Sequence, residues 1–535
     1  MKRGLIFVTL WFCFLLSSAQ IPTEITFDRL GAIYHLNDKG YAMVRTEITA
    51  DQKIDKLIIE IVDIDGNCIE RTSEKIPNKF GRYYYVPLPI NKLGYFYVRV
   101  SKKQGDMSID ASQAGYGVIP DVTLRKKDPE SPFGVGAHYA RYGDWRLGEI
   151  QQQLGMAWLR DKAGWKELDG QNVPHDPFID YLNSYNICWL PILDYVNAWN
   201  GVQDENGFWH FDEDVSAIGR YVKKNKGLLY VYESQNEPNN FAGWKYRFPH
   251  PEGQNWRPQG WGTAFTDLAI QITDTIRSVD PNVRVMWPGE DEWTEFFLEA
   301  RQQTASHIDF TAIHPYVLWI LYPELTKFAT TYYAQQKAML KSHGVSDEIW
   351  ITETGWSTYI PDSTKRHFPY VTELQQAQLL VRNYLIHLYR GAEKVFWYEF
   401  VEEPFGIYDP ETSFGLLRYD NMLTVKPAAV AYANMVNNFR NLTPLGELKS
   451  DNEKTYGIVY SKKGKNQPVA LAIWHLDNTS KQPLNLQYTK QLTATDIFGR
   501  QTIYNVSKGN VDLPISASVQ CVTGFDYRDL KKLIK

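Results

Sequence analysis

The stretch VYESQNEPNN, residues 231–240, places polar side chains at the end of a predicted buried strand. An apolar run leads into it, and Asn236, Glu237 and Pro238 then follow one another. A carboxyl group held at a strand tip can give a proton to a bound molecule or take one from it. The motif is weak by itself, because proline in the first turn after a polar residue is also a common helix start.

A second carboxylate follows another predicted strand. The stretch ITETGW, residues 351–356, carries Glu353 directly after apolar residues. Two facing carboxyl groups, one protonated and one ionised, suit the cleavage of a glycosidic bond. The first helps the leaving oxygen to depart, and the second attacks the anomeric carbon or activates a water. We expect the charge of Glu353, roughly 5 Å away, to hold Glu237 protonated.

The pattern around these motifs predicts the elements that position them. Short apolar runs alternate with amphipathic helical stretches through residues 131–440, and each run begins apolar and ends polar or aromatic. Eight βα units of this kind predict a (β/α)8 TIM barrel whose functional residues lie at the C-terminal ends of the strands. Helices are predicted at 263–279 and 372–390, among others. The eight runs are 133–139, 158–165, 187–195, 228–238, 283–290, 308–316, 349–356 and 395–404.

Both flanks of the predicted barrel have the pattern of β-strands. Residues 22–125 show alternating strands with turn signals and predict an immunoglobulin-like β-sandwich, and residues 125–132 read as a linker. Residues 441–535 predict a second β-sandwich. These flanking domains either bind glycan or brace the barrel. We favour bracing, because neither shows an obvious aromatic platform.

The first residues are typical of a secretory signal peptide. Lys2 and Arg3 precede an apolar run, and small residues ending in Ala19 follow it. A signal peptide at 1–19 predicts a secreted or periplasmic protein that begins at Gln20. Cys13, inside the apolar run, leaves a lipid-anchored form as the lesser alternative. No later stretch is long and apolar enough to predict a transmembrane segment.

Charge and composition narrow the class of partner. The net charge is −5 and there is no long basic run, so nucleic acid and anionic membrane surfaces are not expected partners. The chain has 17 Trp and 34 Tyr. These rings indicate either a large core or a cleft in which aromatic faces contact sugars.

Neither cysteine nor histidine spacing predicts a cofactor. Cys68, Cys188 and Cys521 lie far apart, which fits neither a disulfide framework nor a zinc site. No histidine pair has metal-ligand spacing, so we expect no catalytic metal.

The two carboxylate motifs resemble those of the clan A glycoside hydrolases. YESQNEPN, residues 232–239, is similar to the YEIWNEPN style of the β-xylosidase and α-L-iduronidase family, and ITETGW to β-glucanases of the clan. Ser234 and Gln235 replace the usual apolar pair. The resemblance implies that Glu237 is the acid/base and Glu353 the nucleophile.

The same resemblance implies further substrate-binding residues. Asn236 matches the residue that bonds the sugar 2-hydroxyl, and Arg160 the arginine that supports the nucleophile. His314 and Tyr316 lie where the clan places groups near the nucleophile. Trp397 matches the tryptophan beneath the sugar that is cleaved.

Other residues at the predicted strand ends have two interpretations each. His138 is either a sugar ligand or a structural histidine, and Glu290 either touches substrate or does not. Glu233 is best explained as a buried, hydrogen-bonded group. The group Glu399, Glu402 and Glu403 forms a solvated loop, a sugar-hydroxyl site or a weak cation site. The tryptophans expected around the cleft are Trp165, Trp199, Trp244, Trp319 and Trp356.

The hypothesis that these patterns favour is a secreted, retaining β-glycoside hydrolase acting on polysaccharide or oligosaccharide. One alternative is a non-catalytic carbohydrate-binding protein on a glycosidase-like barrel. Such a barrel would be expected to lose Glu237 or Glu353, and both are present. The other alternative is a transglycosylase, which would use the same residues with another acceptor. Nothing in the sequence predicts the oligomeric state.

Overall fold

The computed structural model describes residues 23–48, 54–75, 80–139, 143–290, 292–319, 321–361, 368–406, 408–477 and 479–535. The predicted signal peptide lies outside these residues. Among the helices that are described, none combines the length and the hydropathy that crossing a membrane needs. The chain forms two compact units, and the larger comprises Leu30–Asp38, Ile90–Tyr95 and Tyr116–Lys535. Three short segments of the predicted N-terminal domain, residues 30–38, 90–95 and 116–125, therefore group with the barrel.

The smaller unit is built from antiparallel strands. β3 pairs with β1 and β6, and β4 pairs with β5 and β7, in two separate sheets. The short strand β2 pairs in parallel with the last residues of β8, and both of these segments belong to the larger unit. The strands are β1 (Glu24–Phe27), β2 (Ile33–His35), β3 (Tyr41–Ile48), β4 (Lys56–Asp63), β5 (Cys68–Lys75), β6 (Phe80–Pro87), β7 (Gly94–Gln104) and β8 (Met107–Ile119).

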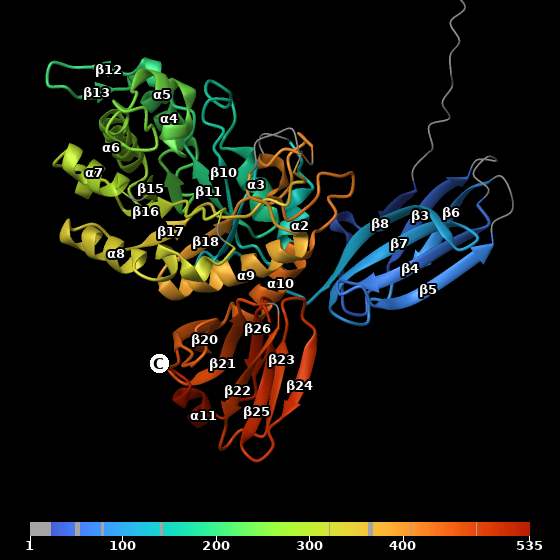
Figure 1. Ribbon diagram of the computed structural model, residues 1–535. Helices are drawn as coiled ribbons and strands as arrows, with labels where there is room; N and C mark the ends of the chain where they lie inside the picture. The colour runs from blue at the N-terminus through green and yellow to red at the C-terminus, as the bar shows by residue number, and fades with distance from the viewer. Residues whose placement is uncertain are drawn as a thin grey trace, which may run out of the picture. The chain divides into compact units, whose positions relative to one another are not determined.

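The larger unit contains the predicted barrel. Within the described residues, eight parallel strands close in chain order, and the last pairs with the first (Figure 1). This confirms the (β/α)8 barrel with β domains on both flanks. The strands are β9 (Phe133–Gly136), β10 (Trp158–Lys162), β11 (Cys188–Ile192), β14 (Val231–Glu233), β15 (Arg284–Pro288), β16 (Phe310–Ile313), β17 (Ile349–Ile351) and β18 (Lys394–Trp397).

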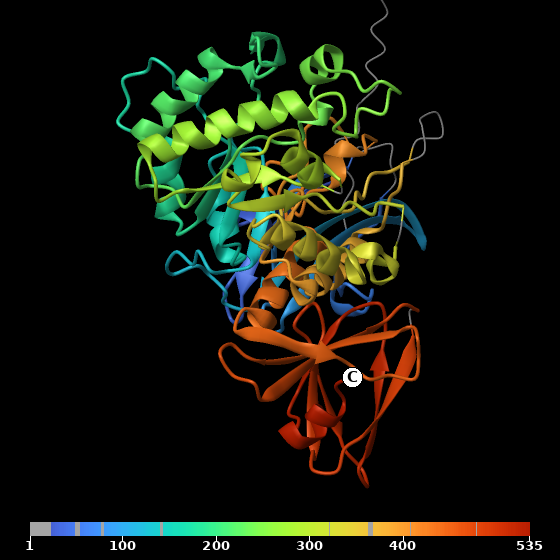
Figure 2. The same cartoon turned by 90° about the vertical axis from the view of Figure 1, so that its left-hand side faces the viewer.

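Helices lie outside the ring of strands in both views of the ribbon (Figure 1, Figure 2). A two-stranded hairpin, β12 (Val202–Gln203) and β13 (Trp209–His210), extends one of the connections. The helices are α2 (Leu147–Gln153), α3 (Pro177–Ser184), α4 (Asp212–Lys224), α5 (Ala242–Arg247), α6 (Gly262–Val279), α7 (Trp293–Ala300), α8 (Tyr332–Ser342), α9 (Glu373–Arg390) and α10 (Pro427–Phe439).

Local sequence signals explain the bounds of α9. The side chain of Thr372 accepts a hydrogen bond from the backbone N–H of Gln375. The side chain of Gln375 in turn accepts one from the backbone N–H of Thr372, so two N–H groups of the first turn have partners. The helix ends at Gly391, which has φ of 108°. Glycine reaches this left-handed conformation without the steric cost that other residues meet.

The barrel interior is apolar where the strands begin. A cluster of buried side chains includes Trp158, Val231, Phe310 and Trp350, each near the start of its strand. The rings of Trp158 and Trp350 meet edge to face with centroids 5.3 Å apart. This packing fills the interior below the strand ends, and Nζ of the buried Lys394, at the start of β18, lies over the rings of Trp158 and Trp350.

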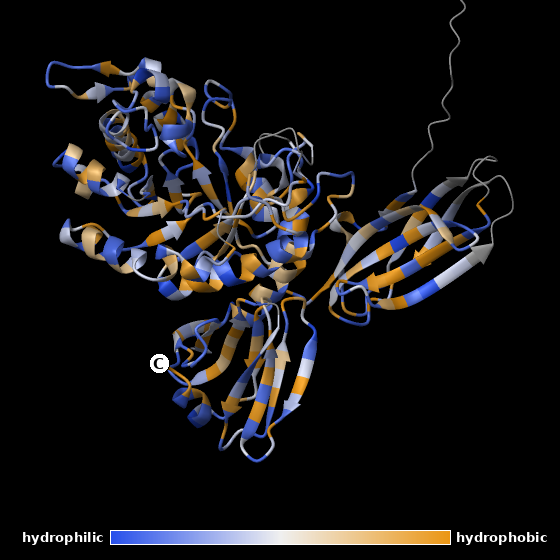
Figure 3. Ribbon diagram, viewed as in Figure 1, coloured by the Kyte–Doolittle hydropathy of each residue, from blue (hydrophilic) through white to orange (hydrophobic). Residues whose placement is uncertain are grey.

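The C-terminal β domain completes the larger unit. Apolar and polar residues alternate along its strands, as in β25, and the apolar set forms one core (Figure 3). A six-stranded sheet contains β19, β20, β21, β23, β24 and β26, and β22 pairs with β25. The elements are β19 (Leu442–Glu447), β20 (Thr455–Lys462), β21 (Pro468–His475), β22 (Ser480–Asn485), β23 (Gln491–Thr495), β24 (Gln501–Asn505), β25 (Asn510–Ile515), β26 (Gln520–Thr523) and α11 (Tyr527–Lys532).

Candidate active site

Glu237 lies just beyond the C-terminal end of β14. The strand ends at Glu233, and Pro238 begins a 3-10 helix, Pro238–Asn240. Proline therefore starts a helical turn, as the simpler interpretation of the motif predicted. The turn begins directly after Glu237, and the catalytic interpretation of this carboxyl group stays a prediction.

A histidine from another strand end contacts Glu237. His314 follows β16, and its Nδ1 lies 2.6 Å from Oε1 of Glu237. Its Nε2 lies 2.9 Å from the hydroxyl oxygen of Thr352, which follows β17. The side-chain amide of Asn240 donates to the other carboxylate oxygen of Glu237. Three strand ends thus hold one carboxyl group.

The structure corrects the expectation that Glu353 holds Glu237 protonated. Burial alone would raise the pKa of Glu237, but the neighbouring His314 and the hydrogen bonds of the site lower that pKa below its ordinary value. Burial alone would lower the pKa of His314, but the charges of Glu353 and Glu237 raise it to about 9. At neutral pH the Glu237–His314 pair therefore holds one proton, and it lies on the imidazole.

Glu353 lies beyond the end of β17 and is held by two donors. Nη1 of Arg160 donates to its Oε1 at 2.6 Å, and the hydroxyl of Tyr316 donates to its Oε2 at 2.9 Å. The side chain of Glu353 is 11% exposed. Together the two donors bond both carboxylate oxygens and hold the side chain in one orientation.

Arg160 bonds side chains at the ends of β14 and β17. It is buried in β10 and donates to both carboxylate oxygens of Glu233 at 2.6 and 2.8 Å. Its Nη2 also donates to the side-chain oxygen of Asn236 at 2.7 Å. Glu233 is the buried, hydrogen-bonded group that we expected. Burial alone would lower the pKa of Arg160, but the charges of Glu233 and Glu353 raise it.

The two carboxylates face each other closely. A carboxylate oxygen of Glu237, one of Glu353 and a ring nitrogen of His314 all lie within 4.8 Å of one another. Beside them is a cavity of about 390 Å³. Its walls include His138, Arg160, Asp161, Lys162, Asp194, Tyr195, Asn236, Asn240, Phe241, Glu353 and Tyr398.

Comparison with known proteins identifies the class of enzyme. A protein family described as the glycosyl hydrolase catalytic core matches residues 233–390, a range that includes Glu237 and Glu353. The chain is a glycoside hydrolase. Together with the closed barrel, this match confirms the predicted glycoside hydrolase with a TIM barrel. No curated protein matches the chain.

Several solved structures are similar to this glycoside hydrolase. A family 39 glycoside hydrolase from the gut symbiont Bacteroides cellulosilyticus WH2 has 18% identity and a TM-score of 0.69, covering 93% of this chain and 100% of its own. This likeness shows the fold. A GH30 endoxylanase from Clostridium papyrosolvens C71 has 14% identity and a TM-score of 0.48, covering 76% and 99%. An α-L-arabinofuranosidase from Thermotoga maritima has 11% identity and a TM-score of 0.48, covering 75% and 97%.

Two further predicted residues lie beside Glu237 and Glu353. His138 lines the cavity, and its side chain is 31% exposed. Oε1 of Glu290 lies 3.6 Å from Nδ1 of His314, next to Glu237. Burial raises the pKa of Glu290 to about 7.

Two tryptophans that we expected at the cleft, Trp397 and Trp356, are buried instead. Trp397 is fully buried, and its indole N–H donates to the backbone oxygen of Phe414 at 3.1 Å. Trp356 is 2% exposed, and its ring centroid lies 6.1 Å from that of Trp397. Neither ring lines the cavity of the glycoside hydrolase; the next residue, Tyr398, does so. The indole N–H of Trp397 has its partner behind the mouth, whereas Nε1 of Trp356 is buried without a hydrogen-bond partner among the described residues.

The other tryptophans also fall into packed and exposed sets. Trp165 donates to the backbone oxygen of Asp194 and Trp244 to that of Val196, and both are buried. Trp199 and Trp319 are 58% and 74% exposed. Composition cannot separate these sets, because the same residue type serves a core and a cleft.

Sequence reasoning missed three groups at the site. Asp194, in the loop after β11, accepts a hydrogen bond from the backbone N–H of Asn236 at 3.4 Å, and burial raises its pKa to about 7. Asn240 bonds Glu237, and Tyr398 lines the cavity. Asn240 follows Glu237 by three residues and Tyr398 follows Trp397 directly, whereas Asp194 lies within the apolar run 187–195. The position of all three after a strand was the available signal.

Two groups of side chains lie close enough to hold a metal ion within the described part of the chain. They are Glu237, His314 and Glu353, and His138, Glu399 and Glu403. In the first group, Arg160 and Tyr316 already donate to Glu353, so a cation would have to compete with them.

Proposed function

We propose that the barrel cleaves β-glycosidic bonds of oligosaccharide or polysaccharide with retention of the anomeric configuration. The observation that carries this proposal is the approach of Glu237 and Glu353, whose oxygens lie within 4.8 Å. Retaining enzymes have carboxyl groups about 5–5.5 Å apart, whereas inverting enzymes leave room for a water at about 6.5–9.5 Å.

In the first step, a carboxylate oxygen of Glu353 attacks the anomeric carbon. A bond forms between them as the bond from that carbon to the leaving oxygen breaks. The leaving oxygen takes its proton from Glu237, which regains the proton shared with His314 through the 2.6 Å hydrogen bond. Arg160 and Tyr316 hold Glu353 in place before the attack.

In the second step, water replaces the enzyme on the sugar. Once the ester has formed, Glu353 carries no charge, and the interaction that most raises the pKa of His314 is lost. Glu237 then acts as a base and takes a proton from the water. The water oxygen bonds the anomeric carbon, the ester bond breaks, and Glu353 leaves as a carboxylate. Two inversions at one carbon give net retention.

We also propose that the protein acts outside the cytoplasm. The support is the signal-peptide pattern of residues 1–19. N-terminal sequencing of protein exported by its host should give Gln20 as the first residue. Intact Met1 on the exported protein would contradict the proposed cleavage.

The retention proposal is tested with aryl β-glycosides and defined polysaccharides. Proton NMR during hydrolysis should show the β-anomer of the product first, before mutarotation. First release of the α-anomer would show inversion and contradict the proposal.

The nucleophile is tested separately with Glu353→Ala. This variant should lose nearly all hydrolysis while keeping its fold, and added azide should partly restore turnover and give a glycosyl azide of inverted configuration. Near-wild-type activity would remove Glu353 from the mechanism.

A further inference from the structure

Asp194 is a buried carboxyl group in the wall of the active-site cavity, and the mechanism above does not use it. It lies two residues beyond the end of β11 and is 6% exposed. It lines the same cavity as Glu353. Burial of a carboxyl group is unfavourable unless hydrogen bonds replace its lost hydration. Asp194 is therefore a candidate for contact with the substrate.

The partners of Asp194 within the protein compensate for its burial only in part. The hydrogen bond from the backbone N–H of Asn236 to its Oδ1 is 3.4 Å long, beyond the ordinary range of about 2.7–3.2 Å. Burial raises the pKa of Asp194 to about 7, although the backbone N–H groups of Tyr195 and Asn236 and the charge of Arg160 lower it. A hydroxyl group at ordinary hydrogen-bond distance would be a better partner than these.

Neighbouring loops hold the backbone at Asp194 in place. The indole N–H of Trp165, from the loop after β10, donates to the backbone oxygen of Asp194 at 2.9 Å. The backbone N–H of Leu193 donates at 2.9 Å to the backbone oxygen of Glu233, the last residue of β14. A carboxyl group on a fixed backbone can bond one hydroxyl group in a defined place.

Asp194 is connected to the nucleophile of the proposed mechanism. Arg160 donates to Glu353 at 2.6 Å and to the side chain of Asn236 at 2.7 Å. The backbone of Asn236 in turn bonds Asp194. All four residues line one cavity. Because Glu353 attacks the anomeric carbon in that mechanism, the sugar that it attacks lies against the wall that contains Asp194.

We propose that Asp194 bonds one hydroxyl group of the sugar that Glu353 attacks, and that this bond selects sugars in which that hydroxyl is free. The inference rests on the proposed hydrolysis of β-glycosides and deepens it. A carboxyl group can accept from a hydroxyl group or, when protonated, donate to it. A sugar without the hydroxyl leaves the buried carboxyl group without this partner, and a site of this kind discriminates strongly against such a sugar.

The test combines a change in the substrate with a change in the enzyme. The best substrate in a panel of p-nitrophenyl β-glycosides is the parent, and kcat/KM for the parent is divided by that for each monodeoxy analogue. At one position, this ratio should be at least about tenfold smaller in Asp194→Ala than in the wild type, because either change removes the same hydrogen bond. The intrinsic reactivity of each analogue cancels, since both enzymes act on the same compounds.

A purely structural role gives a different result. If Asp194 only positioned Asn236, Asp194→Ala would lower kcat/KM for the parent and its analogues alike, and every ratio would stay unchanged. Asp194→Asn keeps the shape of the side chain and an acceptor oxygen, so it should fold even if Asp194→Ala does not. It should reduce the ratio at the same position by about fivefold, through loss of the charged form. Unchanged ratios at all positions in the variants that fold would overturn the proposal.

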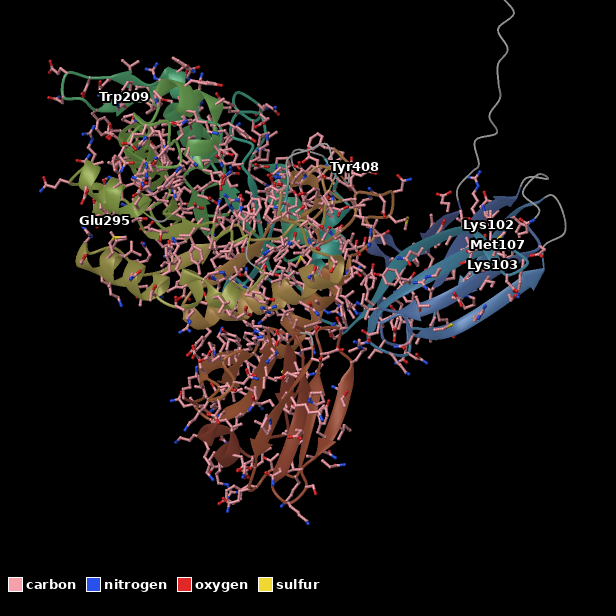
Figure 4. All side chains as sticks on the ribbon, in the orientation of Figure 1. Lys102, Lys103, Met107, Trp209, Glu295 and Tyr408 are labelled. Carbon is pink, nitrogen blue, oxygen red and sulfur yellow. The ribbon has the colours of Figure 1, made fainter. Side chains whose placement is uncertain are left out.

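Two control variants test whether the effect belongs to Asp194. Asp176 is also buried, but its carboxylate accepts from the hydroxyl of Tyr221 and the backbone N–H of Phe178, and it is not among the described residues that line the cavity. Asp176→Ala should lower Tm and change no ratio. Glu295→Gln, at an exposed residue of α7 labelled in Figure 4, should change neither. A change at the same position in Asp176→Ala would contradict the assignment to Asp194.

A binding measurement separates this proposal from the proposed hydrolysis. Calorimetric titration with methyl β-thioglycosides of the same sugars and of their monodeoxy analogues measures affinity without turnover. Binding that needs both Asp194 and one hydroxyl group, without hydrolysis of any glycoside in the panel, would contradict the hydrolase proposal and support the role of Asp194. Hydrolysis with unchanged ratios would contradict the role of Asp194 alone.

Discussion

At the scale of single residues, one shared proton couples three side chains of the active site. His314 carries it because Glu353 and Glu237 raise the pKa of the imidazole to about 9. The same imidazole lowers the pKa of Glu237. In the mechanism that we propose, loss of the charge on Glu353 weakens the hold on this proton, so the covalent step changes Glu237 from an acid to a base.

The first prediction concerns the role of Glu237 as the acid. Glu237→Gln should lower kcat/KM by about 100-fold or more for substrates with poor leaving groups, and much less for dinitrophenyl glycosides. Good leaving groups depart without a proton, so they do not need the acid. Steady-state kinetics on both kinds of substrate measures the difference.

Glu290→Gln is the matched control for this variant. Glu290 is also a carboxyl group beside His314, but we give it no proton to transfer. It should affect both kinds of substrate equally. Equal losses in Glu237→Gln would show that Glu237 is not the acid.

The second prediction concerns pH. For a poor leaving group, kcat/KM should fall as the pH rises through about 9, where the Glu237–His314 pair loses its proton. In His314→Gln the proton must lie on Glu237, so the falling limb should move to lower pH. His343→Gln, at an exposed histidine, should leave the profile unchanged. A basic limb that does not move in His314→Gln would contradict the shared proton.

The free energy of unfolding should also depend on the protonation of His314, and it should fall as the pH rises. Folding raises the pKa of His314 from 6.5 to about 9. Its protonation therefore stabilises the folded state fully below pH 6.5, and this contribution is lost as the pH rises through about 9. Denaturant unfolding between pH 6 and 10 should show a decline that His314→Gln reduces.

At the scale of elements, the side chains of the candidate site lie at or just beyond the C-terminal ends of the strands. β10, β14, β16 and β17 each end near one or two groups of the site, and their buried beginnings form one apolar cluster. At the end of β18, one residue packs in the core and the next lines the cavity. Trp397 packs inward, whereas Tyr398 lines the cavity.

The third prediction separates these two neighbours. Trp397→Ala should lower the free energy of unfolding by about 3–5 kcal/mol, as expected for removal of a buried aromatic side chain. Tyr398→Phe should lower kcat/KM with little change in Tm. Thermal unfolding and kinetics on both variants provide the test. Trp397→Ala with wild-type Tm and reduced kcat/KM would restore the role beneath the sugar that the resemblance implied.

At the scale of the molecule, a buried ion pair joins the barrel to the C-terminal β domain within the larger unit. Arg382 of α9 donates to both oxygens of Glu324 at 2.6 and 2.5 Å. The indole N–H of Trp474, from β21, donates to the same carboxylate at 2.7 Å. All three residues are buried. This network favours the bracing interpretation of the C-terminal domain.

The fourth prediction tests the brace. Glu324→Ala leaves the charge of Arg382 buried without its partner, so it should cost about 3–5 kcal/mol of folding free energy. Trp474→Phe should cost about 1–3 kcal/mol through the lost bond to a charged group. Lys454→Ala, which breaks an exposed pair with Asp477, should change stability by less than about 1 kcal/mol. Chemical unfolding measures all three.

Activity on small aryl glycosides should survive in these variants below their unfolding transition. The network lies outside the cavity that contains Glu353. Loss of polysaccharide turnover alone, with full aryl activity and unchanged stability, would favour glycan binding by the domain over bracing.

The sequence by itself determined the barrel and its two carboxylates. Apolar periodicity is local, so the helices predicted at 263–279 and 372–390 agree with α6 and α9 within one residue. Glu237 and Glu353 could be predicted as a pair because each lies in the loop that follows a strand, and a closed barrel brings strand ends to one mouth. Strand ends were predicted too long, since 349–356 contains only Ile349–Ile351 as strand.

Only the tertiary structure decided where the proton lies and which rings reach the cavity. The position of the proton depends on distances between β14, β16 and β17, which lie far apart in the chain. The burial of Trp397 depends on contacts with Trp356 and Phe414. Electrostatic coupling and packing act through space, so residue type and order along the chain do not specify them.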